Sequence, residues 1–400
     1  MLRKIARAVR AAYADRRLPR AARDEARRDR RDGLGEDAGI DQVVTAAFNW
    51  IGMAQDRSRS QDGGVARHFS LVSGWAPSYP ETTGYIVPTV LDRAASMGDS
   101  NLERRAKRML DWLVSIQMPG GSFQGGMIGQ TPVKATTFNT GQILFGLASG
   151  TRYFGEPFRG PMNSAGDWLV ATQDADGCWR KNASPFARSG EKVYDTHVSW
   201  GLLEAARVDQ TRGYAEAALR NVDWALTKQQ PNGWFSDNCL DDPTRPLTHT
   251  IGYALRGVIE AYLFSLEPRY LEASRRCADG ALSAMLPNGS LPGRLASDWS
   301  AGASWVCLTG LAQIAHCWLL LHRETGDVRF RDGAYRANQF LRRTILVAGD
   351  PNTVGGVKGS FPVSGGYGRF EYLNWACKFV IDSNLLEQQV RIAENAATAR

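Results

Sequence analysis

An internal repeat of 56 residues constrains this chain more than any other feature. Three segments align without gaps: DWLVSIQMPGGSF from Asp111, DWLVATQDADGCW from Asp167 and DWALTKQQPNGWF from Asp223. A fourth segment, DGALSAMLPNGSL from Asp279, keeps the same frame. The turn glycines of these segments are Gly121, Gly177, Gly233 and Gly289, at intervals of 56 residues. A fixed period of this length is the signature of stacked repeat units.

The flanking sequence extends the array to six units. NWIGMAQ from Asn49 leads to Gly63, and FLRRTIL from Phe340 leads to the glycine-rich residues 355–359. Each unit has an apolar-periodic segment, a turn, a polar loop and a second apolar-periodic segment, and the three- and four-residue spacing predicts helices. Thr, Asn, Asp and Ser at the second-segment starts suit helix caps. The second helices are expected to begin near Tyr79, Phe138, Tyr194, Leu247, Ala303 and Phe370.

A helix pair cannot bury its apolar surfaces alone, so neighbouring pairs must stack. The expected fold is an all-α, single (α/α)6 toroid over residues 45–392, with an open superhelical solenoid as the alternative. Closure is favoured because the count is six, aromatic residues gather at the second-helix starts, and the last unit is not a polar cap. Residues 1–44 are expected to form a basic arm, partly helical or disordered, and residues 393–400 a tail.

Charge is concentrated in the arm. Residues 1–32 hold twelve Arg and Lys against five Asp and Glu, so they account for the whole net charge of +7. A nucleic-acid partner is not expected, because such proteins carry basic surface on the folded body. The first residues, MLRKIARAVRAAY, form an amphipathic pattern that predicts peripheral contact with an anionic membrane, with a solvated arm as the alternative. No secretory signal, long apolar run or C-x-x-C pair occurs, so we expect a cytoplasmic protein or one peripheral to the inner membrane.

The repeat carries a family resemblance. Gln173-x3-Gly177-x-Trp179, with its counterpart at Gln117, resembles the QW motif of triterpene cyclases and the related repeat of protein prenyltransferases. That resemblance implies an α/α toroid with the active site in its central cavity. The plan is also similar to that of (α/α)6 sugar enzymes: six-hairpin glycosidases, unsaturated glucuronyl hydrolases, N-acylglucosamine 2-epimerases and uronyl C5-epimerases. The strings GWFSDNCLDDPTRPLTHTIGYALRGVIE and GGYGRFEYLNWACKFVIDSNLL resemble repeat proteins found among cell-surface polysaccharide genes.

Isoprenoid chemistry lacks its usual residues here. The Asp-x-Asp-Asp acid of the cyclases is absent, and Asp241-Asp242-Pro-Thr-Arg245 fails as a diphosphate-binding motif at its final position. Asp237, Cys239 and His249 have the residue types of the zinc site of a protein prenyltransferase. That family takes its His from a later repeat, however, so the trio is a weak metal candidate. No cofactor is expected.

The polar residues at the second-helix starts are the candidate site, because helix N-termini would point into a central cavity. The catalytic candidates are Glu81, Tyr85, Asp195, His197, His249, Tyr367 and Glu371. The substrate-binding candidates are Tyr79, Gln124, Asn139, Arg180, Trp234, Asn238, Trp299, Trp305, Arg369, Asn374 and Lys378. As structural alternatives, these residues would serve as helix caps or as aromatic core.

Two chemistries suit such a set. Epimerisation at C5 of a uronic acid needs acid/base groups on opposite walls and a cation for the substrate carboxylate. Glycoside hydrolysis needs two carboxyl groups roughly 5–9.5 Å apart, and a lyase shares the first step of epimerisation. We expect an enzyme acting on a uronic-acid-containing glycan or its lipid-linked precursor in polysaccharide biosynthesis or modification. The alternatives are an isoprenoid-handling enzyme and a non-catalytic helical scaffold.

Overall fold

The computed structural model describes residues 17–31 and 33–398, and twelve helices of this part form six hairpins. The outer helices are α3 (Ile40–Asp56), α5 (Ser100–Ser115), α7 (Glu156–Thr172), α9 (Tyr214–Leu226), α11 (Pro268–Ser283) and α13 (Val328–Arg342). The inner helices are α4 (Pro80–Met97), α6 (Thr137–Phe154), α8 (Thr196–Ala206), α10 (Thr248–Ser265), α12 (Leu308–Thr325) and α14 (Asn374–Thr398). A short 3-10 turn, η1 (Val193–Asp195), precedes α8.

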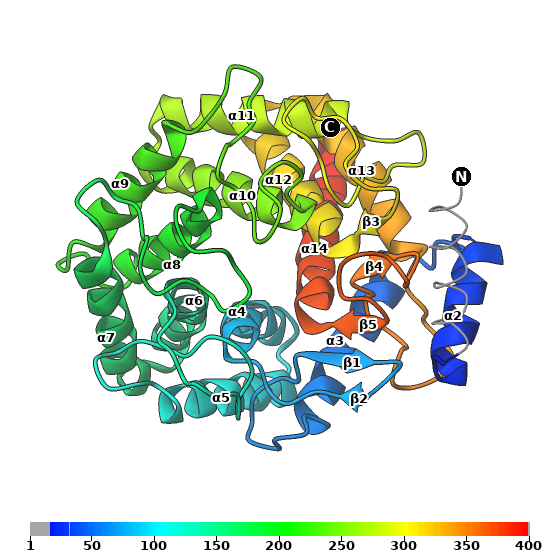
Figure 1. Ribbon diagram of the computed structural model, residues 1–400, viewed down its shortest axis with the longest axis horizontal. Coiled ribbons are helices and arrows are strands. Elements are labelled where there is room, and N and C mark those ends of the chain that lie inside the picture. Colours follow the sequence, from blue (N-terminus) through cyan, green and yellow to red (C-terminus); the bar gives the residue numbers. More distant parts are fainter. Residues whose placement is uncertain (1–16, 32, 399–400) are drawn as a thin grey trace, which may run out of the picture.

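The hairpins close into a ring (Figure 1). Each inner helix packs on the next, and α14 packs against both α3 and α4 at the seam. β1 (His68–Ser70) of the first unit pairs antiparallel with β5 (Glu371–Leu373) of the last unit, and also with β2 (Gly74–Trp75). A second small sheet joins β3 (Val306–Cys307) to β4 (Ser360–Phe361). The prediction of a closed (α/α)6 toroid is confirmed, although these short strands in the loops were not anticipated.

The repeated turn glycine explains the 56-residue period. Gly233 has φ +84°, and a Cβ there would lie 2.2 Å from the main-chain oxygen of Arg276 on the next outer helix. Glycine meets both conditions because it has no side chain. At the seam, a Cβ on Gly355 would lie 2.0 Å from the main-chain oxygen of Ala46 on α3. The last unit therefore contacts the first as each unit contacts its successor.

The repeated glutamine links the same neighbours. The Gln173 side-chain amide donates to the main-chain oxygens of Gly177, in its own turn, and of Ala217, on the next outer helix, at 2.9 and 2.8 Å. Gln117 and Gln229 make the corresponding pairs of bonds in their units. The amide therefore bonds one carbonyl of its own hairpin and one of the next, and the Gly177 oxygen also accepts a 2.8 Å bond from the Asn221 side chain. The QW-like motif is thus a joint between consecutive hairpins.

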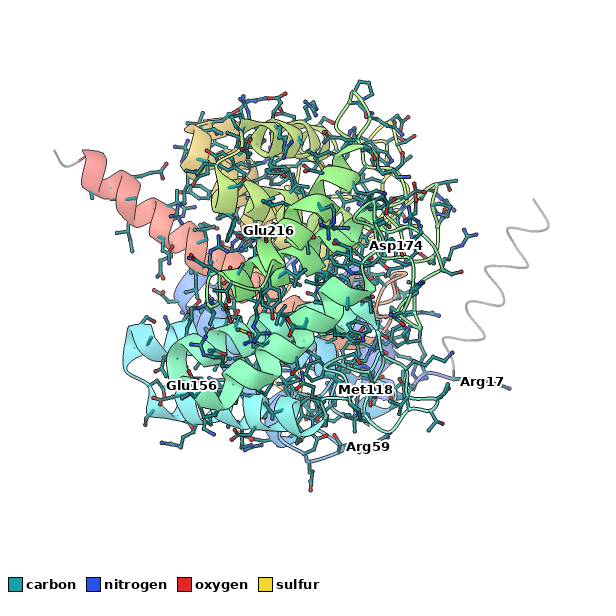
Figure 2. The ribbon with its side chains drawn as sticks, turned by 90° about the vertical axis from the view of Figure 1, so that its left-hand side faces the viewer. Arg17, Arg59, Met118, Glu156, Asp174 and Glu216 are labelled. Atoms are coloured by element: carbon teal, nitrogen blue, oxygen red, sulfur yellow. The ribbon has the colours of Figure 1, made fainter. Side chains whose placement is uncertain are left out.

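The two faces of the ring differ (Figure 2). Arg59, Met118 and Asp174 lie on the side that carries the long connections leading into the inner helices. The C-terminal turns of α14 project from the opposite side. The short connections from inner to outer helices lie on that side, and α14 runs through most of the segment expected to be a tail. No helix in the described part of the chain is long and apolar enough to cross a membrane.

Part of the basic arm is a helix docked on the toroid. On α2 (Arg20–Arg31), Glu25 and Asp29 both form ion pairs with Lys358, and all three side chains are buried. Asp29 also accepts a 2.7 Å hydrogen bond from the main-chain N–H of Val363. The amphipathic segment expected to contact a membrane, residues 1–13, lies outside the described residues.

Candidate active site

A cavity of about 160 Å³ lies at the N-terminal ends of the inner helices. Aromatic side chains form most of its wall, with three titratable groups of other kinds among them. Its lining residues are Arg67, Tyr79, Glu81, Tyr85, Phe138, Ser184, Phe186, Tyr194, Leu240, His249, Thr250, Tyr253, Tyr367 and Trp375. They come from the first two turns of several inner helices and from the loops that precede them. The ring thus brings together residues that are up to 308 positions apart in the chain.

Glu81 is the one carboxylic acid among the described residues of this lining. It lies in the first turn of α4, directly after Pro80, and its carboxylate accepts a 2.6 Å hydrogen bond from the Tyr79 hydroxyl. Burial raises the pKa of Glu81 to about 7, and the Tyr79 hydrogen bond and the Arg67 charge offset only part of that effect. Near neutral pH both its protonated and its ionised form are therefore populated.

His249 enters the cavity from the start of α10, which lies across the ring from α4 (Figure 1). Its Nδ1 lies 2.8 Å from Oε1 of Gln313. Because an amide oxygen only accepts hydrogen bonds, Nδ1 carries the ring proton and Nε2 carries the lone pair. Burial lowers the pKa of His249 to about 4, so the ring is neutral at physiological pH.

Arg67 supplies a positive charge at the rim. Its guanidinium lies 5.1 Å from the ring centroid of Trp375 and 6.0 Å from that of Tyr79. It donates to a carboxylate oxygen of Glu371 at 3.2 Å and lies 2.8 Å from Nδ1 of His68. Aromatic faces and a carboxylate hold this guanidinium in place while one side of it faces the cavity.

Three further tyrosines of the lining carry buried hydroxyl groups. Burial raises the pKa of Tyr85, Tyr253 and Tyr367 well above the usual value, so all three hydroxyls stay protonated. The Tyr253 ring lies 4.4 Å from the His249 ring, centroid to centroid, and the Tyr367 ring lies 5.4 Å from it. Tyr253 and the neutral imidazole of His249 therefore lie together on α10, across the cavity from Glu81, whereas Tyr85 lies one turn after Glu81 on α4.

Of the catalytic candidates, Glu81, Tyr85, His249 and Tyr367 line the cavity, whereas three do not. His197 is buried against the rings of Phe138 and Tyr253, which line the cavity, and its Nδ1 lies 2.7 Å from Oε1 of Gln142. Aromatic rings enclose it, and burial lowers its pKa well below the usual value. Asp195 is buried outside the lining, and burial raises its pKa to about 7. Glu371 faces Arg67 and His68.

The binding candidates scatter more widely, and only Tyr79 lines the cavity. Trp234 and Trp299 pack edge to face with ring centroids 5.1 Å apart and lie outside the lining. Arg180 pairs with acidic residues of its own unit, and Lys378 lines a cavity at the opposite mouth of the ring. The remaining candidates lie outside the lining: Gln124, Asn139, Asn238, Trp305, Arg369 and Asn374.

The weak metal candidate is not assembled. No group of three or more His, Cys, Asp and Glu side chains within residues 17–31 and 33–398 is placed to hold a metal ion. His249 of that trio turns its Nδ1 to Gln313. Although His249 follows Cys239 by only ten residues, the fold does not place it with Asp237 and Cys239 as a set of metal ligands.

Arg67 and Trp375 are the main residues that the sequence reasoning missed. Arg67 lies in the first connection, far from any second-helix start, and it reaches the cavity because β1 pairs with β5. Trp375 is the second residue of α14. The only available signal was its place in EYLNWACKF, where the tryptophan falls in the first turn of an inner helix.

Comparison with known proteins agrees with the architecture. Residues 78–261 match the family model of the squalene-hopene cyclase C-terminal domain. No curated protein is significantly similar in sequence.

Solved structures share the fold at low identity. A sugar epimerase from a ruminal bacterium is 13% identical with a TM-score of 0.69, covering 87% of this chain and 98% of its own. An unsaturated glucuronyl hydrolase from Bacillus sp. GL1, responsible for the degradation of glycosaminoglycan, is 14% identical with a TM-score of 0.68, covering 86% and 96%. A D-mannose isomerase is 12% identical with a TM-score of 0.67, covering 86% and 97%. The chain thus contains a match to the squalene-hopene cyclase C-terminal domain within an α/α toroid similar to six-hairpin glycoside hydrolases, isomerases and sugar epimerases.

Proposed function

We propose that the protein is a sugar epimerase that moves a proton on a single uronic acid residue held in the aromatic cavity. One observation carries the proposal. A buried carboxyl group with a pKa of about 7, Glu81, faces the protonated Tyr253 and neutral His249 across one small cavity. Epimerisation requires this placement, because a proton leaves one face of the sugar ring and another arrives on the opposite face.

The size of the cavity favours a sugar over an isoprenoid. Drug-sized ligands occupy sites of roughly 300–1,000 Å³, and this cavity has about 160 Å³. That space suits one pyranose ring and is too small for a long isoprenoid chain. Tyr and Trp faces offer stacking surfaces for the ring, while Glu81, His249 and Arg67 offer hydrogen-bonding partners for its polar groups.

The reaction we propose begins with the substrate carboxylate bound by Arg67. Ionised Glu81 takes the hydrogen from C5, and the electron pair of the broken C–H bond delocalises into the adjacent carboxylate. Arg67 and the tyrosine hydroxyls stabilise that charge by electrostatic attraction and hydrogen bonding. Tyr253 then gives its proton to the other face of C5. Glu81 loses its extra proton to water, and Tyr253 regains one through His249, so the catalyst returns to its initial state.

Hydrolysis is less well supported. Both standard routes use two carboxyl groups flanking the glycosidic bond, and Glu81 is the one carboxylic acid in the described lining. Lyase chemistry would share the carbanion and differ in losing the substituent at C4.

The proposal places the enzyme in the cytoplasm, acting on a cell-surface glycan or its lipid-linked precursor. The six free cysteines suit a reducing compartment.

The test is solvent isotope exchange. Oligosaccharides ending in α- or β-linked glucuronate, mannuronate or galacturonate are incubated with the protein in D₂O and analysed by mass spectrometry and NMR. We expect one deuterium at C5 and the appearance of the C5 epimer. New reducing ends without deuterium at C5 would instead identify a hydrolase, and an unsaturated product would identify a lyase.

Matched variants separate catalysis from folding. Glu81→Gln and Tyr253→Phe should reduce exchange by roughly 10²- to 10⁴-fold, the usual contribution of a general acid or base. Asp195→Asn is the control, because Asp195 is a buried carboxyl with a similarly raised pKa that does not line the cavity. It should retain exchange within a few-fold of the parent rate. Unchanged exchange in both Glu81→Gln and Tyr253→Phe, or no exchange with any uronide of the set, contradicts the proposal.

A further inference from the structure

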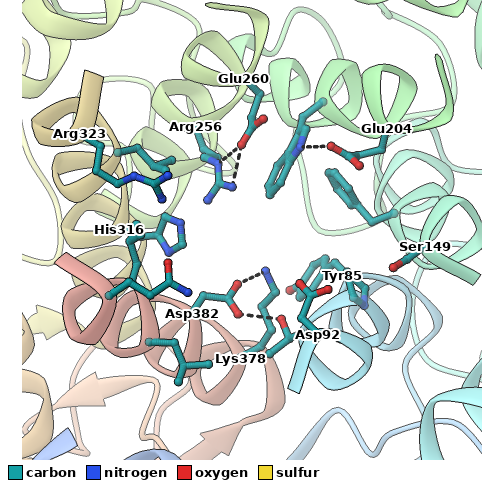
Figure 3. Close-up of a pocket in the computed structure, with 18 of the residues that line it drawn as sticks. Tyr85, Asp92, Ser149, Glu204, Arg256, Glu260, His316, Arg323, Lys378 and Asp382 are labelled. Atoms are coloured by element: carbon teal, nitrogen blue, oxygen red, sulfur yellow. Dashed lines mark hydrogen bonds and ion pairs between the residues drawn. The ribbon is translucent and has the colours of Figure 1, made fainter. Parts of the chain in front are cut away.

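A second cavity, of about 390 Å³, opens at the other mouth of the ring, where the inner helices end (Figure 3). Aromatic residues separate it from the first cavity: the Phe379 ring lies 5.5 Å from that of Tyr85 and 6.0 Å from that of Tyr253. Tyr85 lines both cavities, one on each side of this partition. A glycan chain cannot thread through the ring, so the second cavity is not an extension of the first.

The wall of the second cavity is charged on every side. All six inner helices contribute a polar or charged side chain to it, and Figure 3 shows these side chains converging on one open space. Four of its described lining residues are carboxylates: Asp92, Glu204, Glu260 and Asp382. The first cavity, in contrast, holds one carboxyl group among aromatic rings.

Four basic residues balance these carboxylates: Arg152, Arg256, Arg323 and Lys378. Three of them form ion pairs with three of the carboxylates: Arg256 with Glu260 at 2.7 Å, Arg152 with Glu204 at 3.0 Å, and Lys378 with Asp382. Burial lowers the pKa of His316 well below its usual value, so this ring is neutral and the formal charges of the described lining cancel.

Stability alone does not account for this wall. Lys378 is 4% exposed and Glu260 is 6% exposed, so both charged groups have lost most of their water. Replacing such buried ion pairs with apolar side chains is often neutral or stabilising. The ring keeps them around an open space wide enough for a small molecule. A ligand with its own hydrogen-bonding groups would replace the lost water.

The charge pattern selects the chemistry of that ligand. An apolar molecule would leave the charged groups without partners. A polyanion would meet four carboxylates and the C-terminal ends of the inner helices, which carry partial negative charge. A bare metal ion lacks a ligand set among the described residues. Hydroxyl groups donate to carboxylates and accept from Arg and Lys, so a neutral polyhydroxylated molecule satisfies both halves of the wall.

We propose that this cavity is a second binding site, specific for an uncharged saccharide unit. The site is independent of the chemistry assigned to the first cavity. Asp92, on α4, and Arg323, on α12, lie at its mouth with exposed side chains and make no ion pair or hydrogen bond within the described structure. They are the groups most available to a ligand. Tyr85 gives the two sites a shared wall.

Titration calorimetry and saturation-transfer NMR on the full chain test the proposal. The probes are glucose, galactose, mannose, maltose and cellobiose, with glucuronate and inorganic phosphate as anionic comparisons. We expect saturable binding of at least one neutral sugar and weaker or no binding of the anions at this site. Failure of all five neutral sugars to bind, or binding of phosphate with displacement of the sugar, overturns the proposal.

Variants locate the binding. Asp92→Asn and Arg323→Gln change exposed side chains, so the fold should be retained, and each should raise the dissociation constant by roughly tenfold or more. Asp111→Asn, at an exposed position of outer helix α5, is the matched control. Glu81→Gln tests the first cavity and should leave this affinity unchanged. The site is refuted if Asp92→Asn and Arg323→Gln both bind the sugar as tightly as the parent protein does. It is also refuted if Glu81→Gln is the one variant that loses binding.

Discussion

The pKa of Glu81 makes a quantitative prediction about the pH dependence of stability. Burial raises this pKa from 4.5 to about 7, so the folded protein holds the proton more tightly than the unfolded chain does. The favourable contribution is fully present below about pH 4.5, and it is lost as the pH rises through 7. A difference of about 2.5 units corresponds to about 3 kcal/mol of unfolding free energy.

Glu81→Gln removes the titration while keeping an oxygen that can accept the hydrogen bond from Tyr79. Urea unfolding at pH 5 and at pH 8 then gives two free energies for each protein. The loss of stability between these pH values should be about 2–3 kcal/mol smaller in the variant than in the parent. Asp195→Asn should produce a similar and additive reduction, because burial raises the pKa of Asp195 to about 7 as well.

An identical pH dependence in Glu81→Gln and the parent would refute the reasoning. It would mean that Glu81 is solvated and that its pKa lies near the ordinary value. The assignment of this group as a base poised at neutral pH would then be wrong. A variant that is less stable at both pH values by the same amount would report a packing effect and leave the pH-dependent difference as the decisive quantity.

Three further predictions concern the repeat and the docked arm. Gly233→Ala should lower the unfolding free energy by about 2–4 kcal/mol, since the new methyl group meets a main-chain carbonyl of the next hairpin. Gly98→Ala also replaces a glycine with positive φ but meets no atom within 4 Å, so about 1 kcal/mol is expected; equal costs would contradict the close-contact argument. Gln173→Ala should cost about 1–3 kcal/mol in the same urea assay, because the two hydrogen bonds of its side-chain amide are lost. Lys358→Met leaves the buried Asp29 without a cationic partner and Glu25 with Arg28 alone. It should therefore release α2, measured as faster tryptic cleavage within residues 20–31, whereas the exposed Lys107→Met should leave that rate unchanged.

The repeat made the fold predictable, because the sequence signal and the structural cause are the same atoms. Gly177 recurs where a positive φ and a close approach require glycine, and Gln173 recurs where its amide joins two hairpins. A period of 56 residues therefore specified the hairpin and its neighbour contact together. The number of units and the aromatic inner-helix starts then predicted closure.

The site was predictable only in part. Position in the repeat correctly identified the first turn of an inner helix, which placed Glu81 and His249 in the cavity. It could not give the direction of each side chain, so His197, the second residue of α8, lies outside the lining, although His249 holds the same place in α10 and lines the cavity. Arg67 reaches the cavity through a strand pairing between the first and last units, and no local pattern reports such a pairing. Lys378, a full turn beyond Asn374, already belongs to the opposite mouth.

The contact of Gly355 with Ala46 has a consequence for how the protein is made. Of the six hairpins, the one that closes the ring is synthesised last. The surface on which it packs belongs to the hairpin that is synthesised first. Until then, the nascent chain presents α3 and α4 with one flank uncovered. A circular permutation that opens the chain at another short connection between helices would place the uncovered flank on a different hairpin. The folded toroid should be the same.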